Sequence, residues 1–302
     1  QRDHLALFSL WGQLAEEKGN FRDAVLALGK VYWHREVGTE KSEILNKKSI
    51  KKRCKYFITP FFNYYAMFKN VFLQRLVARI RRFLLWFFVL TFLWVLVYRW
   101  VNPPFTLLML QRYIEAMIGN EENPVITYRW TSYHHISPNM AIAVIAAEDQ
   151  DFPTHYGFDI EAIRHAIRYN QTHERTRGGS TISQQVAKNV FLWQNRDWLR
   201  KGLEVYFTLL IELLWSKERI MEMYLNMIEM GDRVFGIAAA ANHYYKVKPE
   251  KLTLEQSAAI AVCLPNPIRY NPTKPTTFLV KRKNWTLRQV QRLGGLRYLK
   301  NM

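Results

Sequence analysis

Cysteine and acidic residues are both scarce in this sequence of 302 residues. Two cysteines are too few for a disulfide scaffold or for a zinc site built from four cysteines. No spacing of His, Cys and Asp that is typical of a metal site is present either. Only 25 Asp and Glu stand against 43 Lys and Arg, which gives a net charge of +18. Hydrophobic residues still make up 49% of the chain, which excludes a disordered polycation.

The excess positive charge is concentrated in residues 41–111, which hold 13 basic and 1 acidic side chains. This region contains a run of sixteen uncharged residues, Phe83–Tyr98, and the apolar stretch continues to Val101 past Arg99. A helix over 83–101 would be about 28 Å long, close to the thickness of the hydrocarbon core of a bilayer. The sequence therefore predicts a transmembrane helix at 83–101, with a buried core helix as the alternative.

The flanks of this apolar run predict its orientation. Basic residues precede it, so by the positive-inside tendency the N-terminal side stays cytoplasmic and residues from about 102 onward lie outside. We expect a cytoplasmic helical and basic segment at 1–55 and an aromatic, basic juxtamembrane segment at 56–82. Residues 112–302 are long enough for one outer domain with its own core.

Helix signals dominate this outer domain. Ser137-Pro138 predicts a helix start, and Thr181 and Thr253 each begin a capping-box pattern with Gln three residues later. Alternating strand patterns are scarce, and residues 124–131 are the best candidate. The expected fold class is mainly α.

The first candidate functional cluster is Glu148-Asp149, followed by Phe152, His155 and Gly157. An apolar helix leads into Glu148, so partial burial should raise the pKa of its carboxyl group toward a range useful for proton transfer. A solvated acidic loop is the alternative.

The second cluster begins at Gly178-Gly179 and continues through Ser180 and Thr181. A Ser-Thr helix start offers free backbone N–H groups that would suit an anion. The helix that follows carries polar side chains on neighbouring turns, at Gln184, Gln185 and Lys188. An ordinary flexible helix cap is the alternative.

The third and fourth clusters follow along the chain. Arg196, Arg200 and Glu204 recur at four-residue spacing beside Lys201, which predicts either a shared functional face or a surface ion-pair ladder. Asn226 ends the fourth cluster, and the alanine run at 238–241 indicates close helix packing.

Taken in order, these clusters resemble the motifs of glycosyltransferase family 51, the peptidoglycan glycosyltransferases. The four motifs, which lie between about Ala141 and Pro272, read E-D-x-x-F-x-x-H-x-G, G-G-S-T-I-S-Q-Q-x-x-K-N, R-K-x-x-E and I-M-E-x-Y-L-N. A single membrane segment with one outer domain resembles the monofunctional biosynthetic members. One departure lies at His243-Tyr244-Tyr245-Lys246-Val247, where the family more often has Tyr-Phe-Gly-Lys.

The resemblance implies a lysozyme-like α-helical domain with a smaller membrane-proximal lobe, placed on the outer side of the bacterial cytoplasmic (inner) membrane. It implies that Glu148 is the general base for the 4-hydroxyl of an acceptor sugar and that Glu204 acts near a diphosphate leaving group. Residues expected to contact substrate are His155, Ser180, Thr181, Gln184, Gln185, Lys188, Arg196, Arg200, Lys201 and Asn226. The implied substrate is lipid II, polymerised into β-1,4 glycan strands with release of undecaprenyl diphosphate.

Physical chemistry separates this reaction from hydrolysis on the same fold. A glycosidase must protonate a poor sugar leaving group, whereas a diphosphate leaves as an anion that cations stabilise. Cations at Lys188, Arg196, Arg200 and Lys201 near Glu204 favour the transferase, and a lytic hydrolase or a non-enzymatic basic membrane scaffold are the alternatives.

No cofactor is required by the sequence, although Mg²⁺ or Mn²⁺ bridging Glu204 and the diphosphate is compatible with it. The bilayer and the growing glycan strand are the expected partners, other cell-wall synthesis proteins are compatible ones, and nucleic acid is not expected. No transpeptidase is expected, because Lys-Thr-Gly is lacking and Ser49-x-x-Lys52 lies in the basic segment.

Overall fold

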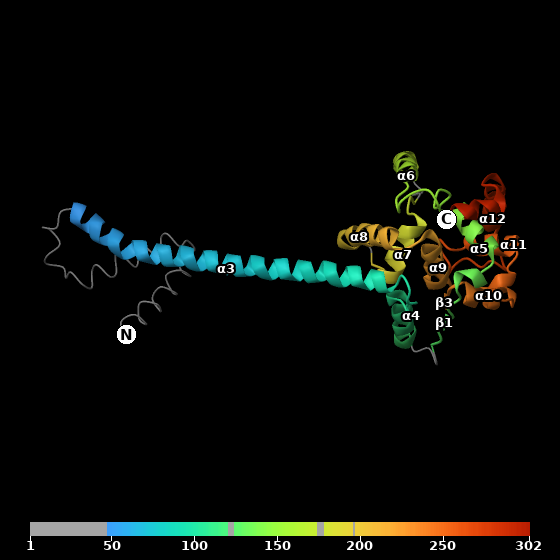
Figure 1. The fold of residues 1–302 in the computed structure, drawn as a ribbon, viewed down its shortest axis with the longest axis horizontal. Coiled ribbons are helices and arrows are strands. Elements are labelled where there is room, and N and C mark those ends of the chain that lie inside the picture. Colours follow the sequence, from blue (N-terminus) through green and yellow to red (C-terminus); the bar gives the residue numbers. More distant parts are fainter. Residues whose placement is uncertain (1–46, 120–123, 174–177, 196) are drawn as a thin grey trace. The chain divides into compact units, whose positions relative to one another are not determined.

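The computed structural model describes residues 47–119, 124–173, 178–195 and 197–302. It divides into two compact units, Gln1–Trp86 and Phe87–Met302, and the second contains the site (Figure 1). The helices are α3 (Lys47–Val97), α4 (Leu107–Ile118), α5 (Pro138–Glu148), α6 (Ile160–Thr172), α7 (Ile182–Phe191), α8 (Trp198–Leu214), α9 (Lys217–Met227), α10 (Ile237–Tyr245), α11 (Leu254–Ala261) and α12 (Thr277–Arg292). Short 3₁₀ turns lie at η1 (Tyr133–His135), η2 (Pro249–Lys251) and η3 (Gly295–Asn301). The expected mainly α fold is confirmed.

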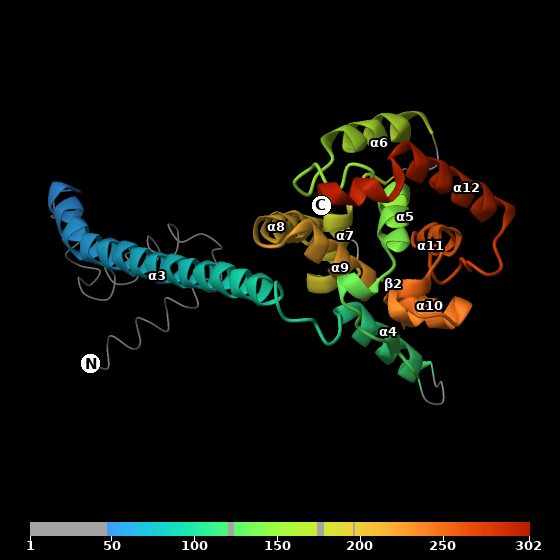
Figure 2. The same cartoon turned by 45° about the vertical axis from the view of Figure 1, so that its right-hand side comes forward.

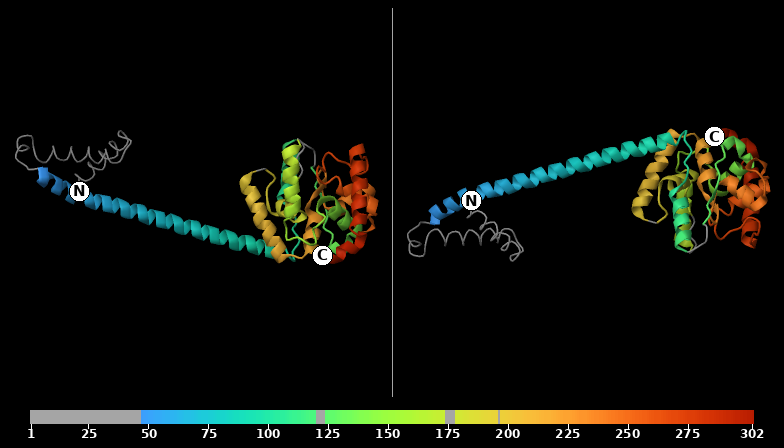
Figure 3. Two further views of the ribbon diagram at one scale, coloured as in Figure 1. Left: turned by 90° about the horizontal axis from the view of Figure 1, so that it is seen from above. Right: turned by 90° about the horizontal axis from the view of Figure 1, so that it is seen from below.

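Helix α5 lies in the core of the domain because almost every residue in it is apolar and small or branched. Residues 140–146 are all buried, and the helix packs against α11, α12 and η3 (Figure 2). On the other side of the core, α7 packs against both α8 and α9. Helices α8 and α12 therefore lie at opposite ends of the domain, with α5, α7 and α9 between them (Figure 3).

The strands form one small sheet in the order β1-β3-β2. Strand β1 (Thr127–Tyr128) pairs in parallel with β3 (Val234–Phe235), and β2 (Glu229–Gly231) pairs antiparallel with β3 across an irregular register. The strand expected within 124–131 is confirmed, but only two of its residues are in the sheet.

The predicted helix starts are confirmed at three positions. Ser137 precedes α5 with Pro138 at its first turn, and both Thr181 and Thr253 form complete capping boxes with Gln184 and Gln256. The side chain of Ser137 differs from the expectation, because its hydroxyl donates to the carbonyl of Leu252 and not to its own helix.

The apolar segment ends earlier than expected. A stretch long and apolar enough to cross a membrane covers Phe72–Val97, but the helix stops at Val97 and residues 98–100 form a turn, so a helix through Val101 was wrong. Arg219 of α9 contacts the turn that follows this end, since its guanidinium donates to the carbonyls of Tyr98 and Val101. The last carbonyls of the helix itself accept from the N–H groups of residues 98–101 and, at Val95, from the indole of Trp215.

Helix α3 is continuous from Lys47, so residues 47–55, within the expected basic segment, are helical. Residues 1–46, where a helical pair was expected, lie outside the described residues. The turn after α10 keeps its shape without the family's glycine: Lys246 adopts the left-handed conformation with φ 56° and its N–H bonds to the carbonyls of Ala241 and Asn242.

Candidate active site

Glu148 is the last residue of α5, where the buried helix meets a loop. Its Oε2 accepts a hydrogen bond of 3.0 Å from the side-chain amide of Gln185, on α7. Its Oε1 is shielded from water and has no hydrogen-bond partner among the described residues. One oxygen of the carboxylate is therefore fixed by a hydrogen bond, and the other accepts none from the described residues.

The surroundings of Glu148 act on its pKa in both directions. Burial raises the pKa and is the largest cause, with a smaller upward contribution from the neighbouring Asp149. The hydrogen bond from Gln185 and the positive charges of Arg282 and Lys188 oppose this rise. The net direction is upward, as expected for a carboxyl group used in proton transfer.

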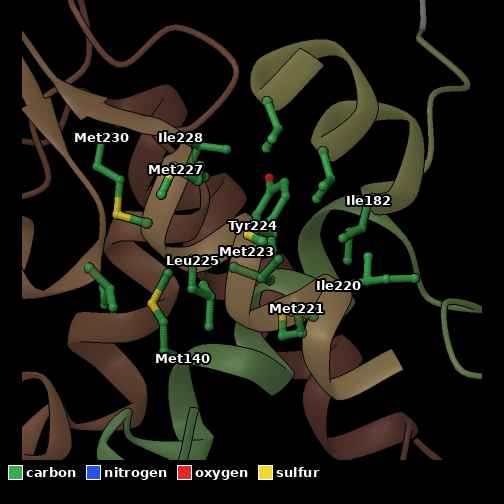
Figure 4. Close-up of a cluster of buried hydrophobic side chains, with 14 of the residues drawn as sticks. Met140, Ile182, Ile220, Met221, Met223, Tyr224, Leu225, Met227, Ile228 and Met230 are labelled. Carbon is green, nitrogen blue, oxygen red and sulfur yellow. The ribbon is translucent and has the colours of Figure 1, made fainter. Parts of the chain in front are cut away.

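Tyr224 of α9 fixes the orientation of Gln185. The tyrosine ring is fully buried among apolar side chains such as Ile182 and Met223 (Figure 4), and its hydroxyl donates to Oε1 of Gln185 over 3.2 Å. Burial holds the pKa of Tyr224 well above its usual value, so the group stays a neutral donor. Because the amide oxygen accepts from Tyr224, the amide nitrogen must face Glu148.

Asp149, the residue after Glu148, connects the end of α5 to the start of α7. One of its oxygens accepts the N–H of Ile182, the first residue of α7, over 2.9 Å, and the other lies 2.9 Å from Nε2 of His155. The N–H of Gly157 donates to Nδ1 of His155, so that ring nitrogen is an acceptor and Nε2 carries the proton. Gly157 has φ 83°, and a Cβ there would lie 2.7 Å from the side chain of Thr208.

Glu204 of α8 lies in a different environment, although it too is buried. Lys201 donates to its Oε1 over 2.6 Å and Arg200 to its Oε2 over 3.1 Å. Arg200 is itself mostly buried, whereas about 45% of the Lys201 side chain is exposed. The ion-pair arrangement that the spacing predicted is therefore present, but its carboxylate is buried and not on the surface.

Comparison with known proteins agrees with this geometry. Residues 116–291 match the family model described as transglycosylase. The chain is 47% identical over 228 residues to a biosynthetic peptidoglycan transglycosylase of Pseudomonas putida (strain GB-1), which covers 75% of this chain and 96% of that protein. It is 48% identical to the protein of the same description from Pseudomonas entomophila (strain L48), with the same coverage, and 45% identical over 230 residues to that of Stutzerimonas stutzeri (strain A1501), covering 76% and 95%.

The chain belongs to the transglycosylase family. The match extends past the fourth motif, which ends at Asn226, and includes all of α12 except its last residue. Both carboxylates on which the resemblance depends, Glu148 and Glu204, lie within the match.

Several residues expected to contact substrate have another role in this transglycosylase. His155 has both ring nitrogens engaged, and Asn226 is fully buried with its amide bonded to both backbone groups of Thr131 and to the carbonyl of Glu222. The capping box uses the side chains of Thr181 and Gln184, and both are buried. These hydrogen bonds hold the site in shape.

The expectation of free backbone N–H groups at the start of α7 was wrong for three of them. The N–H of Thr181 donates to the side chain of Gln184, that of Ile182 donates to Asp149, and that of Gln184 donates to the hydroxyl of Thr181. The positive end of the helix is therefore already opposite a carboxylate of the protein. Ser180 is exposed beside this helix start, and Arg196 lies outside the described residues.

The donor set around Glu204 does not fit a divalent cation. Both of its oxygens accept from cationic side chains, and among the described residues no group of three or more His, Cys, Asp or Glu could hold a metal ion. We therefore derive no step through a metal at this position.

The sequence analysis missed Arg282. It lies on α12, 134 positions after Glu148, and yet its charge acts on that carboxylate. No local spacing connects the two residues, and only the basic character of the C-terminal stretch marks the region in sequence.

Proposed function

We propose that this transglycosylase is a membrane-anchored peptidoglycan glycosyltransferase that polymerises lipid II into β-1,4 glycan strands and releases undecaprenyl diphosphate. The observation that carries the proposal is the state of Glu148. Its pKa is raised by burial, one oxygen is fixed by Gln185, and the other oxygen has no partner among the described residues.

This arrangement suits a general base. The carboxylate of Glu148 would take the proton from the 4-hydroxyl of the acceptor sugar as that hydroxyl oxygen forms a bond to C1 of the donor sugar. The bond from C1 to the diphosphate oxygen breaks, and its electron pair leaves with the diphosphate. A raised pKa makes the carboxylate a stronger base while leaving it ionised at sufficiently high pH.

The cations of the domain suit the leaving group. Lys201 is half-exposed and has donor capacity beyond its bond to Glu204, and Arg200 holds the same carboxylate from the next position. A departing diphosphate gains from fixed positive charge, so we assign Arg200, Lys201, Lys188 and Arg196 to this side of the reaction. Glu204 would then position these cations and need not move a proton.

The apolar helix supports anchoring in a membrane, and we propose that the membrane is the bacterial cytoplasmic (inner) one. The basic residues before the span favour an N-terminal side in the cytoplasm and residues 112–302 in the periplasm. The span, predicted at 83–101, corresponds to the apolar stretch Phe72–Val97, and the residues before it would lie on the cytoplasmic side, where cell-wall synthesis proteins are candidate partners. A periplasm-dependent reporter fused after Met302 should be active, and an inactive reporter beside an active cytoplasmic one would contradict this orientation.

Polymerisation of labelled lipid II in detergent or vesicles tests the function directly. The Glu148→Gln variant should lose about 10²–10⁴-fold of the wild-type rate, because the proton acceptor is removed and the amide fills the same space. Glu250→Gln, at an exposed position in η2, is the control that should keep full activity. Near-normal polymerisation by Glu148→Gln would exclude Glu148 as the base.

A lytic hydrolase is the second candidate, favoured by the same raised pKa of Glu148, because a protonated carboxyl group could serve as the acid of a glycosidase. Incubation with finished glycan strands separates the two functions. Shortening of those strands with no polymer formed from lipid II would favour the hydrolase, and polymer formation with intact strands would favour the transferase.

A further inference from the structure

Arg282 is a charged side chain with an unusual position near the site. It lies on α12, which packs against α5, and α5 ends at Glu148. The guanidinium is half-buried, and its Nε is shielded from water without a hydrogen-bond partner among the described residues. A buried cation with an unpaired donor is costly unless a negative charge lies opposite.

The stretch that carries Arg282 supplies no such charge. Residues 265–302 contain nine basic and no acidic side chains. Apart from the half-buried Lys283, the other cations of this stretch, such as Lys281, Arg288 and Arg292, are exposed, where water solvates them. Arg282 alone combines a buried Nε with an electrostatic effect on a carboxylate of the site, and that carboxylate is Glu148.

The unpaired groups on the two helices are complementary. Glu148 has a buried Oε1 without a partner, and Arg282 has a buried Nε without a partner. The groups around Glu148 are Asp149 beside it, Gln185 and Lys188 from α7, Tyr224 from α9 and Arg282 from α12. The two positive charges therefore approach from different helices, and the one on α12 has no other carboxylate in its own stretch.

We infer that Arg282 is a positioning residue for Glu148: its charge, held in place by the packing of α12 on α5, keeps the carboxylate ionised and free to accept a proton. This inference rests on the proposed function, since it gives Glu148 the role of base. Burial would otherwise favour the protonated acid, which cannot accept a proton. The chain thus combines a desolvated base with a nearby buried cation that maintains its charge.

The pH dependence of kcat/KM for lipid II polymerisation tests this role. In Arg282→Gln the acid limb should move to higher pH by on the order of one unit, with recovery toward the wild-type rate at high pH. Arg282→Lys keeps the charge and should keep most of the wild-type profile. Arg288→Gln, exposed on the same helix, is the matched control and should leave the profile unchanged.

Two results would overturn the inference: an acid limb in Arg282→Gln that coincides with that of the wild type, or a loss of rate that is equal at every pH. A different result would contradict the proposed function itself: the wild type would form no polymer from lipid II at any pH. If Arg282→Gln does not fold, Arg282→Met, which keeps the apolar stem, takes its place.

Melting temperatures give a second readout that needs no activity. Arg282→Gln should lower the melting temperature more at pH 8, where Glu148 is ionised, than at pH 5. In a Glu148→Gln background this difference between the two pH values should disappear. A difference that persists without the carboxylate would also overturn the inference.

Discussion

Glu148 and Glu204 are two buried glutamates of one domain with opposite surroundings. Glu148 has a single amide donor and one unpartnered oxygen, and burial raises its pKa. Glu204 has a cationic donor on each oxygen, from Lys201 and Arg200. The difference shows that burial alone does not decide what a carboxylate can do. The number and charge of its donors decide whether it is suited to exchange a proton or to hold cations.

Helix α7 lies between these two regions and belongs to both. It carries Gln185, which bonds to Glu148, and it packs against α8, which carries Glu204. A short rigid helix therefore connects the proposed base to the proposed diphosphate cations, and its first turn is fixed by Asp149 and the Thr181 capping box. Stability at this helix should be coupled to activity at both carboxylates.

The largest expected effect on stability is that of Glu204→Gln. It leaves Arg200 mostly buried without its carboxylate, which should cost on the order of 2–3 kcal/mol of folding free energy. Polymerisation should fall about 100-fold, because the leaving-group cations lose their fixed position. Melting curves and the lipid II assay measure the two effects, with the exposed Glu218→Gln as control. If Glu204→Gln melts at the wild-type temperature, the cationic donors on Glu204 do not make it differ from Glu148 in its contribution to stability.

Glu148→Gln should act on stability in the reverse direction. The folded-state pKa of Glu148 is raised, so the carboxyl group contributes most to stability at low pH, and this contribution is lost as pH rises through the folded pKa. Relative to wild type, the variant should therefore gain melting temperature as the pH rises through the folded-state pKa of Glu148. A difference that is constant with pH would contradict a raised pKa.

A smaller effect is expected for Tyr224→Phe. The loss of one buried hydrogen bond to Gln185 should cost about 1 kcal/mol, and the amide is then free to turn its oxygen toward Glu148. Polymerisation should fall several-fold. Tyr128→Phe removes a comparable hydroxyl, which donates to the carbonyl of Pro103, and should lower stability without lowering activity. Equal activity in the two variants would show that the Tyr224 hydroxyl does not help to orient Gln185 toward Glu148.

The smallest effect should come from Lys201→Gln. Because about 45% of the Lys201 side chain is exposed, the loss of its pair with Glu204 should cost only about 0.5 kcal/mol. Arg200→Gln should cost clearly more, since Arg200 is mostly buried. Chemical unfolding of the two variants side by side measures the difference, and equal costs would argue against a buried Arg200–Glu204 pair.

Features that depend only on residues close together in the chain could be predicted from the sequence. The capping boxes at Thr181 and Thr253 and the start of α5 follow from local hydrogen bonding, and all were confirmed. The apolar helix was predicted too, but the turn that follows its end at Val97 is held by Arg219, which lies more than 100 positions later. Hydrophobicity along the chain contains no information about such a distant donor.

The site residues divide in the same way. Motif spacing identified Glu148, Gln185, Lys201 and Glu204, which the structure joins in two groups. It did not distinguish His155 and Asn226, whose polar groups are occupied inside the fold, from residues with free donors. It also missed Arg282, because its relation to Glu148 arises only when α12 packs against α5.

The end of the apolar helix has a practical consequence for expressing the domain alone. Val95 is fully buried in the domain core, its carbonyl accepts from the indole of Trp215 over 2.9 Å, and Trp94 packs edge-on against Phe191. A shortened protein beginning after Val101 would lose these contacts and leave the donors of Trp215 and Arg219 without their acceptors. Truncation for solubility would thus remove part of the enzyme's own interior, and a fragment that starts near residue 87, where the second compact unit begins, would keep it.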